Sequence, residues 1–490
     1  MVDGSVAVSF GDFPATDPAP IGGGVWRDAM VGIPYSLERL DGVWFASGEP
    51  YWRERTMSLP DDEKRADLFE LYAEDPDRAD RAVFGREPHK DRRGFLKGAG
   101  LAAMGTALGA SIPFHRNMPS GFIPEALAAN PVKIAGKEGL TVLNDRPVNA
   151  ETPAHLLDDE VTPTARHFIR NNGVVPDEMD AAGWALRIDG LVDNPMTLGI
   201  EDLKKKFDVV TQRLTIECGG NGRAFFDPPA SGNQWTLGAV ACSEWTGVRL
   251  ADVLKAAGVK DNVVYTAHVG ADTHLSGKEG KLPISRGVPI EKAMNPGNLI
   301  AFGMNGGPLH AMNGAPLRLV IPGWPGSCSQ KWLKRIWLRD VVHDGPKMTG
   351  SAYRVPDYPV SPGEKVPKSA MKIIHAMPVK SLITTPKTGL AVSGRNLSVA
   401  GHAWAGDNVV ARVDVSIDFG ASWQQADLKS PVNPYAWQRW SADLKFPQKG
   451  YYEVWARATD DRGVSQPFAI AWNPKGYLNN SMHRISVRVS

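Results

Sequence analysis

One cysteine is followed by a run of glycines and an arginine, a pattern suited to binding a metal or a large anionic ligand. The segment reads Cys218-Gly219-Gly220-Asn221-Gly222-Arg223. The glycines permit tight turns and close approach of a ligand, and an arginine can hold a phosphate. A thiolate beside a positive group is a soft-metal ligand or a nucleophile. No histidine lies near Cys218 in sequence to act as a general base. The alternative interpretation is that Cys218 is a buried structural cysteine with no role in binding or catalysis.

Two further stretches place basic groups where an anion could bind. The segment 167–173 carries Arg170 among polar residues, which is typical of an oxyanion-binding loop or of a solvated turn. Farther along, Arg318 begins an apolar stretch, a glycine-rich loop follows, and Lys331 comes after the loop. Basic groups beside free backbone N–H groups can cradle a phosphate without a nucleotide-binding motif.

Composition excludes several classes of protein. The 490 residues include 55 Lys+Arg and 54 Asp+Glu, a formal net charge of +1, so we expect no nucleic acid as partner. A hydrophobic content of 42% indicates a globular chain. The three cysteines form no CxxC pair, which argues against a disulfide framework, a zinc ribbon and a c-type haem. No apolar run reaches the roughly 20 residues of a membrane span.

The region before residue 129 has the features of an export signal. Arg92-Arg93 precede a weakly apolar, glycine-rich run at 98–112, a pattern typical of a twin-arginine signal, with Ala126-Leu127-Ala128 as a cleavage point. A surface arginine pair before a buried helix is the alternative. We expect a periplasmic protein that is exported folded, with a signal segment at 91–128. Residues 1–90 are an extension of uncertain authenticity, because Met57 could be the true start.

The remaining chain predicts two domains of different character. Dense proline, glycine and β-branched residues in 129–370 favour a compact α+β domain. Its expected elements are strands at 184–188, 212–217, 263–268, 317–321 and 334–338 and a helix at 250–257. In 371–490, strand-length runs recur about every ten residues and favour an immunoglobulin-like β-sandwich. These runs lie at 389–405, 408–417, 422–428, 437–444 and 450–460.

Together these stretches resemble the sulfite oxidase family of molybdenum enzymes over roughly residues 150–490. The family's ordered motifs have counterparts at Phe168-Ile169-Arg170-Asn171, Cys218 to Arg223, Trp245-Thr246-Gly247-Val248-Arg249-Leu250, Pro316 to Leu333, Trp472-Asn473-Pro474-Lys475-Gly476 and His483-Arg484. Within the family the chain looks most like the exported bacterial sulfite dehydrogenases. The implied fold is a mixed molybdopterin domain followed by an immunoglobulin-like dimerisation domain.

The resemblance also implies a site built on the molybdenum cofactor, Mo-molybdopterin. Cys218 would be the protein's thiolate ligand to the metal, and Arg170 would bind the anionic substrate. Arg439 is the candidate for a further catalytic arginine that reaches the site from the sandwich. The residues implied to hold the cofactor are Asn171, Asn172, Arg223, Arg249, Asn313, Arg318, Ser329 and Lys331.

Two departures from the family pattern bear on the substrate. Asn172 and Asn313 stand where the family has histidines. A tyrosine that the family often places near the metal aligns close to Ile284. Loss of that tyrosine would make a related sulfur oxyanion or thio-compound a stronger candidate than sulfite.

The first functional hypothesis is a periplasmic homodimeric enzyme that oxidises sulfite to sulfate. Because the chain has no haem motif, its electrons would pass to a separate acceptor such as a cytochrome c. The second hypothesis keeps the cofactor but changes the substrate to a sulfoxide or to carrier-bound sulfur. The third is a secreted binding or assembly module on the same fold with an empty site. Molybdenum content separates the third hypothesis from the first two.

Overall fold

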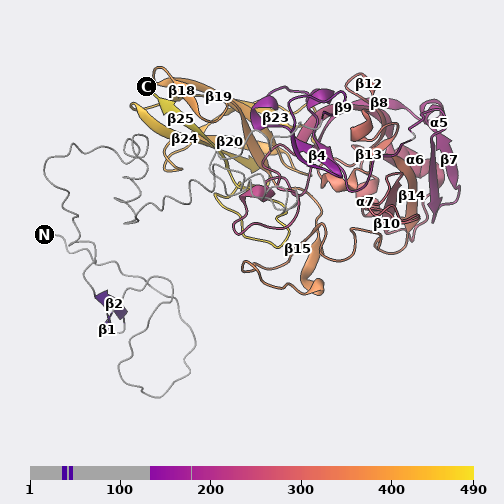
Figure 1. Cartoon of the computed structure of the whole chain (residues 1–490), viewed down its shortest axis with the longest axis horizontal. Helices are drawn as coiled ribbons and strands as arrows, with labels where there is room; N and C mark the ends of the chain where they lie inside the picture. The colour runs from indigo at the N-terminus through magenta and orange to yellow at the C-terminus, as the bar shows by residue number, and fades with distance from the viewer. Residues whose placement is uncertain (1–35, 41–42, 48–132, 178) are drawn as a thin grey trace, which may run out of the picture. The chain divides into compact units, whose positions relative to one another are not determined.

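The computed structural model describes residues 36–40, 43–47, 133–177 and 179–490 (Figure 1). The chain divides into two units, Met1–Ile123 and Pro124–Ser490. In the first unit, β1 (Ser36–Leu40) and β2 (Val43–Ser47) form an antiparallel hairpin. The twin-arginine segment and its expected cleavage point lie outside the described residues and stay predictions. Within the described ranges, no helix has the length and apolar character needed to cross a bilayer.

Small sheets with short helices form the first part of the second unit. One sheet has the order β3-β4-β5, from β3 (Thr141–Asp145), β4 (Val148–Glu151) and β5 (Ile169–Arg170). Another runs β12-β11-β9-β8 with β13 on β11, from β8 (Val209–Glu217), β9 (Val240–Arg249), β11 (Leu299–Met304), β12 (Gly307–Pro308) and β13 (Arg318–Val320). A third runs β10-β14-β6-β7, from β6 (Ala185–Gly190), β7 (Met196–Gly199), β10 (Tyr265–Gly270) and β14 (Leu333–Arg339).

The helices cover these sheets with apolar faces. They are α5 (Ile200–Lys206), α6 (Leu250–Ala257) and α7 (Ile290–Ala293). In α6, Leu250, Val253 and Leu254 recur at helical spacing and are fully buried. The helix ends at Gly258, whose φ of +69° is the left-handed conformation that glycine adopts without strain. The expected helix at 250–257 is therefore confirmed at both ends.

A β-sandwich forms the C-terminal part, as expected. After the ribbon of β15 (Arg354–Pro356) and β16 (Met371–Ile373), one sheet runs β17-β19-β23-β22, from β17 (Lys380–Thr385), β19 (Asn396–Trp404), β22 (Asp427–Leu428) and β23 (Gln438–Lys445). The facing sheet runs β18-β25-β24-β20-β21, from β18 (Leu390–Val392), β20 (Val410–Ser416), β21 (Gln424–Gln425), β24 (Gly450–Asp460) and β25 (His483–Val489). Val399, Trp440, Val413 and Val454 from the two sheets share one buried core. Within this unit, Figure 1 shows the sandwich at one end and α5 and β7 at the other.

Strands occur in every segment where they are expected; β24 has the expected bounds, and the other strands begin or end at different residues. Two central strands are not predicted by the sequence pattern. The strand β9 lies between β8 and β11 and is buried on both faces, so it lacks the alternation that marks a half-exposed strand. The strand β11 is buried in the same way. The positions of both strands depend on hydrogen bonding to neighbouring strands, which the periodicity of the sequence does not reveal.

Candidate active site

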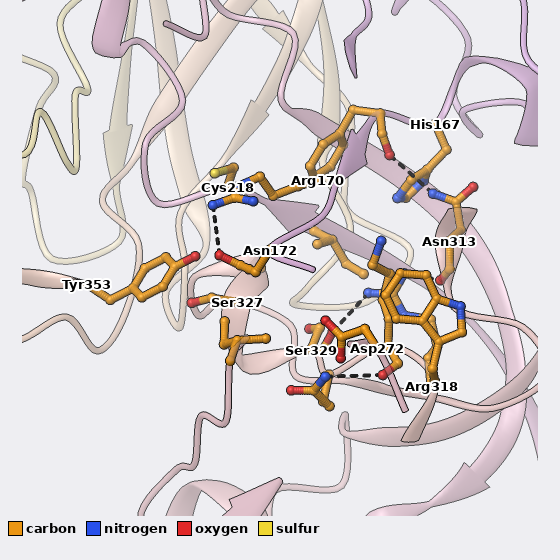
Figure 2. A pocket seen from close by; sticks show the side chains of 17 residues that line it. His167, Arg170, Asn172, Cys218, Asp272, Asn313, Arg318, Ser327, Ser329 and Tyr353 are labelled. Atoms are coloured by element: carbon orange, nitrogen blue, oxygen red, sulfur yellow. Dashed lines mark hydrogen bonds between the residues drawn. The ribbon is translucent and has the colours of Figure 1, made fainter. Parts of the chain in front are cut away.

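Strands from three sheets end around one cavity. Arg170 is the last residue of β5, Cys218 follows β8, Arg318 begins β13, and Asp272 lies two residues beyond β10. The cavity measures about 630 Å³ with its open mouth. Seven of the predicted site residues line it: Arg170, Asn172, Cys218, Asn313, Arg318, Ser329 and Lys331 (Figure 2).

The Cys218 loop is folded by its own backbone and amide groups. The Cys218 N–H donates to the Ala239 carbonyl at 2.9 Å, and the Asn221 N–H donates to the Cys218 carbonyl at 2.8 Å. Gly222 has a φ of +88°, which a residue with a side chain would adopt only with strain. Cys218 is 6% exposed and free, and the other two cysteines are also buried but do not line the cavity. The thiol of Cys218 is therefore the one available to a cavity ligand.

The sandwich braces this loop through a buried carboxylate. Glu217, which precedes Cys218, accepts a hydrogen bond from Lys380 Nζ of β17 at 2.5 Å and from Trp404 Nε1 of β19 at 2.9 Å. Its carboxylate also accepts from Asn221 Nδ2 at 3.0 Å. The Glu217–Lys380 pair is only 3% and 6% exposed. Because both partners are desolvated, removing either would leave a buried charge uncompensated.

A basic wall faces the cavity from β13 and the loop after it. Arg318 donates to the Asn313 carbonyl at 2.7 Å and to the Ser329 carbonyl at 3.2 Å, and its guanidinium stacks over Trp245. Lys331 Nζ donates to the Met312 carbonyl at 2.8 Å. These partners are neutral, so hydrogen bonding satisfies the donors without cancelling the charges.

Burial lowers the pKa values of these cations. It lowers the pKa of Arg318 to about 9. Burial, and then the charge of Arg318, lower the pKa of Lys137 to about 7 and hold that of Lys331 well below its usual range. Asp272 is the single carboxylate among the described lining residues, and burial raises its pKa to about 6. A cluster in which buried cations outnumber the carboxylates favours binding of an anion.

The other end of the cavity surrounds the thiol. Arg170 Nη2 donates to Asn172 Oδ1 at 2.9 Å, and Arg170 also contacts the Asn171 carbonyl. Figure 2 shows Arg170 close to Cys218, with the Tyr353 phenol pointing toward Asn172. Ile284 also lines the cavity, so the position that aligns with the family's tyrosine carries an apolar side chain here.

Four predicted residues do not line the cavity. Asn171 lies in sequence between the lining residues Arg170 and Asn172 and accepts a hydrogen bond from Lys331. Arg223 instead connects the Cys218 loop to the C-terminal segment. Its Nε donates to the Lys475 carbonyl at 2.6 Å, and its guanidinium stacks over Tyr477. Arg249 ends β9 at the start of α6.

The expectation for Arg439 as a catalytic residue is corrected. On β23 it lies opposite His402 and ion-pairs with Asp158 at 2.6 Å, so its charge is neutralised away from the cavity.

Three functional candidates carried no sequence signal. Lys137 donates to Asn313 Oδ1 at 2.5 Å from a segment 176 positions away. Asp272 and Tyr353 line the cavity from loops without a motif. Polar atoms without a hydrogen-bond partner also occur in the wall, at Ser327 Oγ, Gln330 Oε1 and Asp272 Oδ1.

Comparison with known proteins agrees with this geometry. Residues 172–347 match the oxidoreductase molybdopterin binding domain, and residues 371–490 match the Mo-co oxidoreductase dimerisation domain. The chain is 32% identical to sulfite oxidase of Gallus gallus, over 71% of this chain and 77% of that protein. It belongs to the sulfite oxidase family of molybdenum enzymes. Mitochondrial sulfite oxidase of Homo sapiens is 31% identical, over 78% of this chain and 71% of that protein.

A solved structure extends the likeness to the fold. The crystal structure of the sulfane dehydrogenase SoxCD from Paracoccus pantotrophus matches with a TM-score of 0.61 and 28% identity, over 78% of this chain and 97% of that one. The protein is thus a molybdenum oxidoreductase with a Mo-molybdopterin cofactor.

The residues present fit this cofactor. A soft thiolate suits molybdenum, and Cys218 offers its thiol to the cavity. The uncompensated Arg318 and Lys331 suit a phosphate. Unpaired oxygens at Gln330 and Asp272 can accept from the N–H groups of a pterin. The cavity therefore brings together a free thiol, two buried cations and unpaired oxygen acceptors, which are the groups that such a cofactor would require.

Proposed function

We propose that this enzyme oxidises sulfite to sulfate and passes the electrons to a separate acceptor. Sulfite and water give sulfate, two protons and two electrons. The observation that carries the proposal is the arrangement of the cavity, in which the Arg170 guanidinium and the Cys218 thiol share a basic space with one carboxylate. Such a space favours a small oxyanion beside the metal.

Different residues of the cavity would bind the cofactor and the metal. Arg318, Lys331 and Ser329 would hold the cofactor's phosphate and polar edge, and Cys218 would hold the metal. When bound, the cofactor supplies two-electron redox chemistry and oxygen-atom transfer. The protein binds, orients and excludes water around it.

Arg170 would bind sulfite. Its guanidinium is oriented by Asn172 and by Asn149 Oδ1 at 3.4 Å, which are neutral and leave its charge available. A guanidinium can donate two parallel hydrogen bonds to an oxyanion. We therefore expect Arg170→Met to raise KM for sulfite far more than it lowers the free energy of unfolding.

The test uses full-length protein purified with its cofactor. We expect about one molybdenum per chain, turnover of sulfite with cytochrome c, and loss of both in Cys218→Ser. Molybdenum near zero would support the binding-module hypothesis and refute the enzyme. Full molybdenum with sulfoxide reduction in place of sulfite oxidation would refute the substrate assignment alone.

A second candidate substrate is sulfane sulfur attached to a carrier. It is favoured by the apolar Ile284 in the cavity wall and by the likeness to the sulfane dehydrogenase SoxCD. Comparing kcat/KM for sulfite with that for a persulfide-bearing carrier peptide separates the two. Sulfite turnover at least tenfold better would exclude the second candidate.

Export and assembly are further parts of the proposal. The Arg92-Arg93 pair supports periplasmic export, and the match of residues 371–490 to a dimerisation domain supports a homodimer. A double lysine substitution of the two arginines should keep the protein in the cytoplasm. Analytical ultracentrifugation should give twice the chain mass, and a monomer at micromolar concentration would refute the dimer.

A further inference from the structure

We infer that Tyr353 is a substrate-binding residue, whose phenol donates a hydrogen bond to a sulfur oxyanion beside the metal. This rests on the proposed function and adds a residue that the sequence motifs do not contain. Tyr353 lines the same cavity as Cys218 and Arg170. Figure 2 shows its phenol oxygen directed toward Asn172 and Ser327, on the side of the view where Cys218 is drawn.

The ring of Tyr353 is held from several sides. It stacks on Tyr477 with centroids 5.6 Å apart and an interplanar angle of 22°. Its backbone N–H donates to the Tyr477 hydroxyl at 3.2 Å, and its carbonyl accepts from the Ile374 N–H at 3.1 Å. The φ of +53° is uncommon for a residue with a side chain and is kept only where surrounding contacts enforce it. The phenol is therefore preorganised.

A buried arginine also contacts the ring. The Arg286 guanidinium is 4.8 Å from the Tyr353 centroid, and the residue is 1% exposed. Its Nε has no hydrogen-bond partner, and its terminal nitrogens contact the Lys347 carbonyl at 3.5 Å and Cys328 Sγ at 3.6 Å, neither of which is a carboxylate. A buried cation against the ring favours an anion nearby.

The hydroxyl itself is available to a ligand. Among the described residues, the Tyr353 hydroxyl has no hydrogen-bond partner, whereas the Tyr477 hydroxyl is engaged by the Tyr353 backbone. The neighbouring wall residue Ile284 offers no polar atom. An oxyanion bound by Arg170 would thus find in Tyr353 a neutral donor, suited to sulfite and to its product sulfate.

The experiment compares Tyr353→Phe with Tyr358→Phe in the full chain carrying its cofactor. The first variant removes only the hydroxyl and keeps the ring contacts. The control removes a hydroxyl from an exposed tyrosine, 40% accessible, that contacts Glu364. With rates normalised to molybdenum, we expect Tyr353→Phe to raise KM for sulfite about tenfold, with a smaller change in kcat. The control should match the unaltered enzyme.

Direct binding of sulfate to the loaded proteins, measured by calorimetry, separates the two proposals. Tenfold weaker sulfate binding in Tyr353→Phe supports the inference even if sulfite is not oxidised, in which case only the proposed function fails. Unchanged KM and unchanged sulfate affinity in Tyr353→Phe overturn the inference while leaving sulfite oxidation intact. Absence of sulfate binding in every protein overturns both the Tyr353 role and the oxyanion site.

Discussion

Replacing Arg318 by methionine separates a cofactor anchor from a structural brace. The side chain is 4% exposed, and burial lowers its pKa from 12.5 to about 9. That shift corresponds to roughly 5 kcal/mol as an upper limit on the cost of keeping the charge in a cofactor-free cavity. The variant removes this cost, but it leaves the carbonyls of Asn313 and Ser329 without their donor, at about 1–3 kcal/mol each.

In the cofactor-free protein, the relief of the buried charge and the loss of the two hydrogen bonds have opposite effects on stability. In the loaded protein, the cofactor already neutralises the charge, so the substitution has no such relief to offset its losses. We expect the free energy of unfolding of cofactor-free Arg318→Met to change by less than about 2 kcal/mol. In the loaded protein the variant also loses hydrogen bonds from a charged donor, each contributing about 1.5–3 kcal/mol. Cofactor affinity should therefore fall about a hundredfold, and molybdenum per chain should fall with it.

Urea unfolding of both forms and molybdenum analysis test this reasoning. Arg187→Met is a suitable control because that arginine is 66% exposed on β6 and pairs with Asp189. An equal loss of stability in the loaded and cofactor-free forms would show that Arg318 braces the loop and does not anchor the cofactor.

Three further predictions follow from the same site. In cofactor-free protein, an alkylating reagent should modify Cys218 well before the two fully buried cysteines, and loading should protect it; simultaneous modification of all three would contradict this. Because the pKa of Lys137 is lowered to about 7, the unfolded chain binds more protons above that pH. Cofactor-free protein should therefore gain stability from pH 7 to 9 and lose it as the pH falls through 7, and Lys137→Met should flatten this profile in urea titrations. Lys380→Met leaves Glu217 as an uncompensated buried charge and should cost about 3–5 kcal/mol of stability with reduced molybdenum content, whereas Lys429→Met, at an exposed ion pair, should cost under about 1 kcal/mol.

The anion-binding wall was predictable because its residues lie in short motifs. In the stretch from Arg318 to Lys331, one strand and one glycine-rich loop carry both cations, so local sequence is enough to bring them together. Cys218 was predictable for the same reason, since a strand runs directly into a glycine-rich turn.

Local sequence could not identify site residues that lie far from the motifs in the chain and have no motif of their own. Lys137 contacts Asn313 across 176 positions, and nothing in its own neighbourhood marks it. The error at Arg439 has a related cause, because a strand pattern indicates the face of a residue but not the partner opposite it. Here the partner is Asp158, which removes the arginine's charge from the site.

The carboxylate of Glu217, directly before Cys218, connects the two domains. Glu217 lies in the catalytic half, yet two of its three side-chain partners belong to the sandwich. We therefore expect that cutting the chain near residue 370 would not yield a smaller working enzyme, because the first fragment would keep its basic wall but lose two of the three contacts that hold Glu217 beside Cys218.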